Sequence, residues 1–316
     1  MSRKGPGLLL TAFAKGDPQV AAVTRMIAAA EADILVLADI DYDHGNATLA
    51  ALRDAIRAGG GPEYRHLASP RPNSGIDSGR DLDGDGRLGR AADAQGFGRY
   101  EGQGGLAILS RVPLRLVADH SHRLWRDMPD SLVIDHAGTA GPDALNADIQ
   151  RLSSVAHAEY AAALPGGPPL TLMIFHAGPP VFDGPEDRNG RRNHDEVLFW
   201  KHRLDGAFGP APDPPFAILG AANLAPRGGD GRSAAIRALL SDPRLQDPAG
   251  LREQPTVTWP APGPGALRVD YVLPSAGLTV TGAGVMAADP KASRHHLIWV
   301  DLADHAVTAV RDPSGN

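Results

Sequence analysis

Cysteine is absent from the 316 residues, which excludes a disulfide scaffold, a thiolate metal site and a cysteine nucleophile. Aromatic residues make up only 5% of the chain, and its formal net charge is −6. A general nucleic-acid-binding protein is expected to carry a basic face and rings on which bases stack, so nucleic acid is a less favoured partner. The overall charge still permits a local basic pocket for a small anionic substrate.

Long hydrophobic runs are also missing. The longest, such as 34–37 and 216–219, have the length of a strand and fall far short of the roughly 20 residues of a membrane-spanning helix. The first six residues lack the apolar stretch of a signal peptide. We therefore expect a soluble protein without membrane contact, periplasmic or secreted if a leader has been removed. The sequence does not define its oligomeric state.

Glycine and proline are abundant, at 37 and 28 residues, whereas average usage of the two together is about 12%. Hydrophobic residues reach 42%, which is enough for a sizeable core and excludes global disorder. The composition predicts many ordered loops between short elements. We expect a single domain over residues 1–310, with a long Asp/Gly-rich loop at 69–100 and a frayed tail at 311–316.

Periodicity and capping signals predict a mixture of helices and strands. Asp17 followed by Pro18 is typical of a helix start, Asn46 is expected to cap a second helix, and 193–196 has the spacing of a capping box. A further helix is expected at 232–240. The expected strands are 33–39, 105–111, 151–160, 170–176, 216–220, 268–273 and 296–301. This alternation predicts a layered α/β domain.

Polar side chains recur at the ends of these apolar strands. They are Asp39, His176, Asn223 and His295, with Asp270 inside a fifth strand. Acid, imidazole and amide groups at successive strand ends indicate a site at one edge of a sheet. A single carboxylate suits Mg²⁺, which takes few protein ligands, while histidine and asparagine can stabilise charge on a phosphoryl group.

Several motifs together resemble the endonuclease/exonuclease/phosphatase superfamily, in a bacterial branch with degenerate motifs. The resemblance covers most of the chain and implies a four-layer α/β/β/α sandwich, in which two packed mixed β-sheets are flanked by helices. It also implies metal-dependent hydrolysis of a phosphate ester, as phosphodiester or phosphomonoester. The matching segments, in the family's order, are 35–40 (LVLADI), 104–111 (GGLAILSR), His176, 219–223 (LGAAN), 269–272 (VDYV) and 293–295 (SRH).

The resemblance implies a role for each of the five polar residues. Asp39 takes the place of the family's glutamate that binds Mg²⁺ or Mn²⁺. His176 matches the phosphate-binding histidine, Asn223 the asparagine that stabilises the transition state, and His295 the last histidine of the site. Asp270 would orient a neighbouring group. Without the resemblance, the histidines could be structural, Asn223 a turn residue and Asp39 the end of a strand.

The chain also departs from the family pattern. Ala221 stands where the family has the aspartate that orients or deprotonates water, and Arg294 replaces the aspartate that orients a catalytic histidine. Asp39 is one methylene shorter than glutamate, and the family's first strand has no counterpart before Ser2. Loss of an aligned base costs orders of magnitude in rate. The alternative to an enzyme is therefore an inactive relative that binds a phosphate-bearing ligand or calcium.

A second motif is independent of the resemblance. Asp81, Asp83 and Asp85 have the Asp-x-Asp-x-Asp-Gly spacing of calcium loops, in which alternating carboxylates converge on one cation. The twelfth position is Ala92 instead of glutamate, and Asp93 follows as a candidate ligand. A Ca²⁺ site and a solvated loop rich in Asx turns both fit this pattern.

Three arginines follow His176 at a distance of 12 to 16 residues. Arg188, Arg191 and Arg192 could attract and bind an anionic substrate, or they could form a solvated basic patch.

Overall fold

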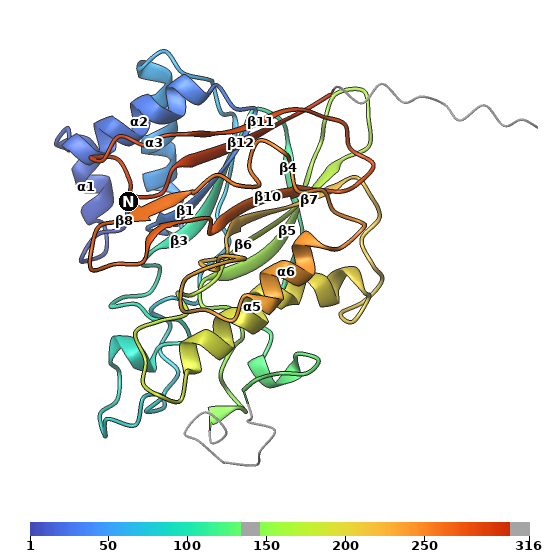
Figure 1. The fold of residues 1–316 in the computed structure, drawn as a ribbon. Coiled ribbons are helices and arrows are strands. Elements are labelled where there is room, and N and C mark those ends of the chain that lie inside the picture. Colours follow the sequence, from blue (N-terminus) through green and yellow to red (C-terminus); the bar gives the residue numbers. More distant parts are fainter. Residues whose placement is uncertain (134–145, 304–316) are drawn as a thin grey trace, which may run out of the picture.

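Two β-sheets lie face to face between two layers of helices in the computed structural model, which describes residues 1–133 and 146–303 (Figure 1). The expected tail at 311–316 lies outside the described residues. The first sheet is antiparallel and has the order β1-β3-β2, formed by β1 (Ile34–Ile40), β3 (Gly105–Ser110) and β2 (His66–Ala68).

The second sheet has five strands in the order β10-β7-β6-β5-β4. Only β6 and β7 run parallel to each other, so this sheet is mixed. Its strands are β4 (Leu114–Asp119), β5 (Ala156–Ala162), β6 (Leu170–His176), β7 (Phe216–Ala221) and β10 (Asp270–Pro274). Two hairpins complete the strands: β8 (Val257–Trp259) with β9 (Gly265–Leu267), and β11 (Val280–Met286) with β12 (Leu297–Leu302).

The helices form the two outer layers. On one side lie α1 (Leu8–Ala14), α2 (Pro18–Ala30) and α3 (Ala47–Ala58), and on the other α5 (Arg188–Leu204) and α6 (Ala234–Leu240), as Figure 1 shows. Short 3₁₀ turns occur at Ala91–Asp93 and Trp125–Asp127. The expected four-layer α/β/β/α sandwich is confirmed, although only one of its two main sheets is mixed.

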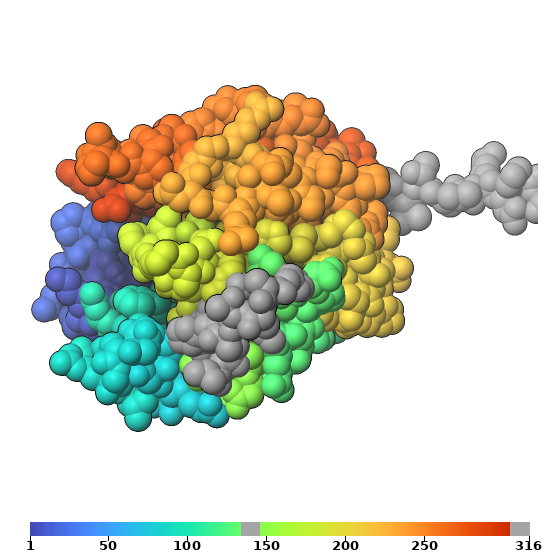
Figure 2. Space-filling model, turned by 60° about the horizontal axis from the view of Figure 1, so that its bottom comes forward, coloured from blue at the N-terminus to red at the C-terminus, as the bar shows by residue number. Residues whose placement is uncertain are grey.

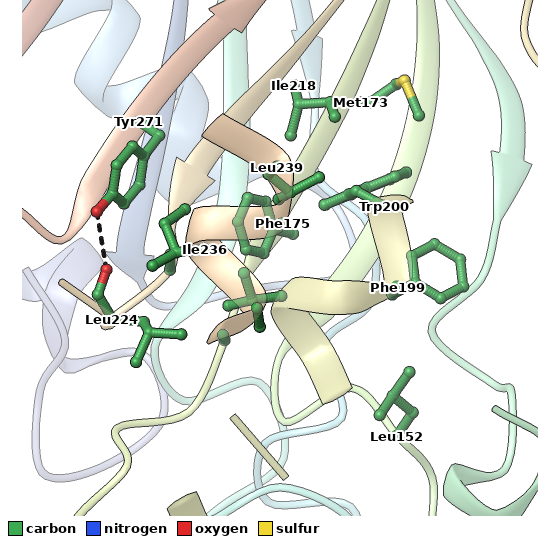
Figure 3. Close-up of a cluster of buried hydrophobic side chains, with 14 of the residues drawn as sticks. Leu152, Met173, Phe175, Phe199, Trp200, Ile218, Leu224, Ile236, Leu239 and Tyr271 are labelled. Atoms are coloured by element: carbon green, nitrogen blue, oxygen red, sulfur yellow. Dashed lines mark hydrogen bonds between the residues drawn. The ribbon is translucent and has the colours of Figure 1, made fainter. Parts of the chain in front are cut away.

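The two-residue period of the strands divides the core into layers. Leu106 and Ile108 of β3 pack between the sheets, with Ile174 of β6, whereas Ala107 and Leu109 face the α1–α3 layer. On the other side, Met173 and Phe175 of β6 face α5 and α6, and Figure 3 shows them with Trp200, Ile236 and Leu239.

The helix starts differ from the expectations in two cases. Asp17 does cap α2, because its Oδ1 accepts from the backbone N of Gln19 and Val20 at 2.9 and 3.1 Å. Asn46 makes no side-chain cap, and Asp43 instead accepts from the first turn of α3.

The expected capping box at 193–196 is also wrong, because α5 begins earlier, at Arg188. Asp183 Oδ2 accepts from the backbone N of Asn189 at 2.5 Å, which supports this earlier start. The polar run at 193–196 therefore lies in the interior of a helix.

The 69–100 segment contains little regular structure and forms the cyan corner of the face shown in Figure 2, near the blue N-terminal segment. Within residues 1–133 and 146–303, no helix combines the length and apolar character needed to span a membrane.

Tyr271 links the core to the loop that follows β7. Its hydroxyl lies 2.9 Å from the carbonyl oxygen of Leu224, as Figure 3 shows, and 2.9 Å from that of Arg268. We predict that Tyr271→Phe lowers the free energy of unfolding by about 1 to 2 kcal/mol, because a buried acceptor loses its donor. Urea denaturation measures this change.

Tyr64→Phe is the matched control, since Tyr64 is also fully buried but its hydroxyl has no hydrogen-bond partner among the described residues. A loss of stability in Tyr64→Phe equal to that in Tyr271→Phe would contradict the role given to the Tyr271 hydrogen bond.

Candidate active site

Three positions predicted from the sequence lie in one row across the five-stranded sheet. His176 at the end of β6 pairs with Ala221 at the end of β7, and Ala221 pairs in turn with Asp270 at the start of β10. Their neighbours Phe175 and Tyr271 face the helices, so the row faces the other sheet. The row occupies the edge of the sheet at which β6 and β7 end.

Asp39 comes to this edge from the first sheet through a β-bulge. The pairing of β1 with β3 shifts between Ala38 and Ile40, and Asp39 has a left-handed φ of 58°. Leu35 and Leu37 face the α1–α3 layer, and strict alternation would turn Asp39 the same way. The bulge breaks that alternation and re-aims the side chain, which is 62% exposed.

Glycine is required opposite Asp39. Gly104 has a φ of 64°, and a Cβ built on it would lie 2.9 Å from Asp39 Oδ1. A side chain at this position would therefore disturb the carboxylate.

Asp270 and His295 form a hydrogen-bonded pair. Asp270 Oδ2 lies 2.8 Å from His295 Nδ1 and accepts from Thr256 Oγ1 at 2.7 Å. Thr256 Oγ1 in turn accepts from the backbone N of Val269 at 3.0 Å, so the Asp270 side of the pair is anchored. Burial opposes protonation of the imidazole, but the hydrogen bond and charge of Asp270 outweigh it and raise the pKa of His295. Asp270 thus orients a neighbouring group, and that group is His295.

His176 has the opposite electrostatic setting. Burial lowers its pKa, although the charges of Asp39 and Asp270 act against this shift. No described residue offers a hydrogen-bond partner to its buried Nδ1. At neutral pH His176 is therefore an uncharged imidazole beside a more readily protonated one.

Asn223 is held in a strained turn directly after β7. Its φ is 50°, and its Nδ2 donates to the carbonyl oxygen of Ala177 at 2.8 Å. Gly220 precedes this turn with a φ of 153°, and a Cβ there would lie 1.9 Å from the carbonyl oxygen of Phe175. The glycine thus permits the close approach of β6 and β7 that brings Asn223 next to the segment after His176.

A sequence model of the Endonuclease/Exonuclease/phosphatase family matches residues 7–295. The chain belongs to this family. No curated protein matches the chain significantly.

Solved structures of the family share the fold at low identity. The endonuclease/exonuclease/phosphatase from Beutenbergia cavernae is 18% identical, with a TM-score of 0.56 over 90% of this chain and 65% of that one, so this chain spans less than two thirds of it. A family protein from Leptotrichia buccalis is 14% identical (TM-score 0.54, 90% and 92% covered). A mannosyl-6-phosphatase from Bacteroides thetaiotaomicron is 11% identical (TM-score 0.52, 93% and 94% covered). These likenesses support the fold alone.

The family implies a divalent metal, and the residues around Asp39 fit one. In the described part of the chain, the only group of three acidic, histidine or cysteine side chains with ligand atoms within 4.8 Å of one another is Asp81, Asp83 and Asp85, and it does not include Asp39. Mg²⁺, however, binds through one or two carboxylates and keeps several waters. Asp39, whose side chain is 62% exposed, offers one such carboxylate.

The structure brings together three of the four expected calcium ligands. Asp81, Asp83 and Asp85 form the group within 4.8 Å, and a hydrogen bond from the backbone N of Gly86 helps hold the pKa of Asp81 below its ordinary value. Asp93 does not join them. It is fully buried, and its two carboxylate oxygens accept from the backbone N of Leu82 and Arg90. This placement corrects the expectation that Asp93 is a ligand, because both oxygens already stabilise the loop.

The three arginines expected to bind substrate do not form one surface. Arg192 is 7% exposed, and its guanidinium donates to backbone carbonyls that include those of Leu152 and Arg151. Arg191 donates to the carbonyl oxygen of Leu132 at 2.7 Å, and Arg188 is the first residue of α5. Arg192 therefore supports the fold, which corrects its expected substrate role, while the expectations for Arg188 and Arg191 stay untested.

Two residues that anchor the site, Thr256 and Asp41, were not predicted from the sequence. Thr256 holds Asp270, and nothing in the sequence marks a lone threonine 14 positions away. Asp41 accepts from the backbone N of Gly104 at 3.1 Å and from that of Arg3 at 2.8 Å. Its signal was available, because the acidic residues 39, 41 and 43 alternate at the end of β1.

We predict that Asp270→Asn lowers the pKa of His295, because the imidazolium loses the negative charge that stabilises it. The fraction of His295 that is protonated at pH 7 then falls. As the pH rises, any step that needs the His295 imidazolium is lost at a lower pH in the variant than in the wild type. Titration of the His295 ring protons by NMR measures the shift. Thr256→Ser keeps the hydroxyl and serves as control. An unchanged His295 pKa in Asp270→Asn would contradict the charge coupling.

Proposed function

We propose that this family member is a metal-dependent phosphoesterase that hydrolyses phosphate esters, with Mg²⁺ or Mn²⁺ as cofactor. The observation that carries the proposal is the Asp270–His295 pair in one row with His176 and beside Asn223. Charged and neutral hydrogen-bonding groups at one sheet edge can bind a phosphoryl group and stabilise the charge that develops during transfer.

Each residue then has a defined part in the reaction. Asp39 would hold the metal, which when bound would supply positive charge to the phosphoryl group. Asn223 uses one amide hydrogen for Ala177 and has the other available for a phosphoryl oxygen. His295, whose raised pKa favours its protonated form, donates from the ring nitrogen opposite to Asp270. His176, uncharged, contributes a hydrogen bond.

Activation of the attacking water is the weak point of this assignment. Ala221 is buried in the row at the position of the family's aspartate, and its methyl group cannot accept a proton. Asp270 lies next to it, but its Oδ2 already serves His295 and Thr256. Asp183 supports the start of α5 through Asn189. The alanine at position 221 favours the second candidate, a protein that binds a phosphate-bearing ligand without turnover.

Restoring the carboxylate tests the proposal. We measure hydrolysis of aryl phosphomonoesters and phosphodiesters with Mg²⁺, Mn²⁺ or Ca²⁺ by the wild type, Ala221→Asp and Ala221→Asn. Ala221→Asp is expected to raise kcat by about 10²–10⁴, the usual contribution of a general base. Ala221→Asn has the same size without the charge and should not do so.

The outcomes separate the two candidates. Metal-dependent turnover by the wild type that His176→Ala abolishes supports the phosphoesterase. Turnover by Ala221→Asp alone shows an intact scaffold whose natural form only binds ligand. If neither the wild type nor Ala221→Asp hydrolyses any substrate while both still bind inorganic phosphate, the enzyme hypothesis is overturned and the binding protein is supported.

Calcium at 81–85 stays a prediction of the sequence, and Asp83→Asn tests it. Bound Ca²⁺ stabilises the folded state, so the wild-type Tm should rise with Ca²⁺ concentration and that of Asp83→Asn should rise less. Equal shifts in both would favour the solvated loop.

A further inference from the structure

Helix α5 buries several polar side chains in its first half. Asn193, Asp195 and Glu196 are at most 1% exposed. Burial of polar and charged groups is unfavourable unless each finds hydrogen-bond partners. The hydrogen-bond partners of these three side chains therefore show which neighbouring segments the helix binds.

Asn193 joins the two segments that leave β6 and β7. Its Nδ2 lies 2.7 Å from the carbonyl oxygen of Gly178 and 2.8 Å from that of Ala222. Gly178 follows His176 by two residues, and Ala222 directly precedes Asn223. One amide group thus uses both of its hydrogens to fix the spacing between the two strand ends.

Glu196 holds the same segment from the next turn of the helix. Its Oε2 accepts from the backbone N of Gly178 at 2.8 Å and from Ser154 Oγ at 3.1 Å, and its Oε1 accepts from the backbone N of Ser154. Burial raises the pKa of Glu196 to about 7. The chain therefore keeps an unfavourably placed acid that joins the segment after β6, through Gly178, to Ser154 before β5.

All backbone hydrogen-bonding groups of Ala177 and Gly178 are occupied. Ala177 donates to the carbonyl oxygen of Ala221 at 2.9 Å and accepts from Asn223 Nδ2 at 2.8 Å. Gly178 donates to Glu196 and accepts from Asn193. A continuous series of hydrogen bonds thus runs from α5 through this dipeptide to the Asn223 amide.

We propose that Asn193 and Glu196 are positioning residues that hold Ala177–Gly178 and thereby set the side chain of Asn223. Neither touches the reacting atoms. This inference rests on the proposed function, because Asn223 is the group that would contact the phosphoryl oxygen. Small displacements of such a group have large effects on rate, since transition-state hydrogen bonds need accurate placement.

Asn193→Asp tests the proposal with little change in size. It removes both donors and sets a carboxylate against two carbonyl oxygens, so the Ala177–Gly178 segment must shift. We expect kcat for an aryl phosphate with Mg²⁺ to fall about 10- to 100-fold, with KM nearly unchanged, because a transition-state contact is lost.

Asp195→Asn is the matched control on the same helix. Asp195 is equally buried, but its Oδ2 accepts from Trp125 Nε1 and the backbone N of Leu132, at 2.6 and 2.7 Å, away from the site segments. The Tm of the Asp195→Asn variant should fall, while its kcat stays within about twofold of the wild-type value. A kcat loss in Asn193→Asp no larger than in Asp195→Asn, or a rise in KM alone, would overturn the proposal.

NMR gives a second readout that does not need turnover. In Asn193→Asp the side-chain amide signals of Asn223 should shift, and in Glu196→Gln the exchange protection of the Gly178 amide should fall by about 10- to 100-fold as a charge-assisted bond is lost. If the wild type hydrolyses nothing, the proposed function fails. Unchanged Asn223 signals and unchanged Gly178 protection in these variants would instead overturn the positioning role.

Discussion

The parallel pairing of β6 with β7 is the constraint on which the site depends. In its register His176 lies beside Ala221, and β10 adds Asp270 on the other side. A slip of one residue would turn every side chain to the opposite face. Phe175 would then leave the α5–α6 core, where it is 1% exposed. The hydrophobic packing of the outer layer therefore keeps the polar row at the inner edge.

The second requirement is that the two sheets contribute to one edge. The bulge at Asp39 takes its carboxylate out of the alternation of β1, and Gly104 leaves room for it. The hairpin of β8 and β9 and the segment before β12 bring Thr256 and His295 to Asp270. Short irregular segments on a rigid scaffold thus carry the groups that meet substrate in the proposed reaction.

The departures from the family pattern have unequal consequences. Arg294 replaces a carboxylate, yet His295 still has an orienting partner in Asp270, so this change leaves the pair intact. Asp270 beside Ala221 is not a free substitute, because its Oδ2 already binds His295 and Thr256. In the proposed reaction the chain therefore keeps the groups assigned to bind and stabilise a phosphoryl group, and it has alanine where the resemblance implies the group for activating water.

Local patterns in the sequence were sufficient for the layered α/β class and for several of the long elements, but α1, β4 and β11 were not predicted from them. The Asp17 cap and the apolar runs of β6 and β7 depend on residues a few positions apart, so they can be interpreted without tertiary contacts. The family motifs also identified the five polar residues that the structure brings to one edge or its immediate neighbourhood. Only long-range packing placed Thr256 on Asp270.

Burial decided the remaining assignments. From the sequence, Arg192 was expected to bind substrate or to form a solvated patch, Asp93 to bind calcium, and 193–196 to cap a helix. In the folded chain Asp93, Arg192 and most of the 193–196 run are buried and form hydrogen bonds with backbone groups. Some of these groups are distant in sequence, as when Arg192 donates to the carbonyl oxygen of Gln95. Such partners are defined by the packing of layers and not by spacing along the chain, so only the tertiary structure could show that these side chains hold backbone segments in place.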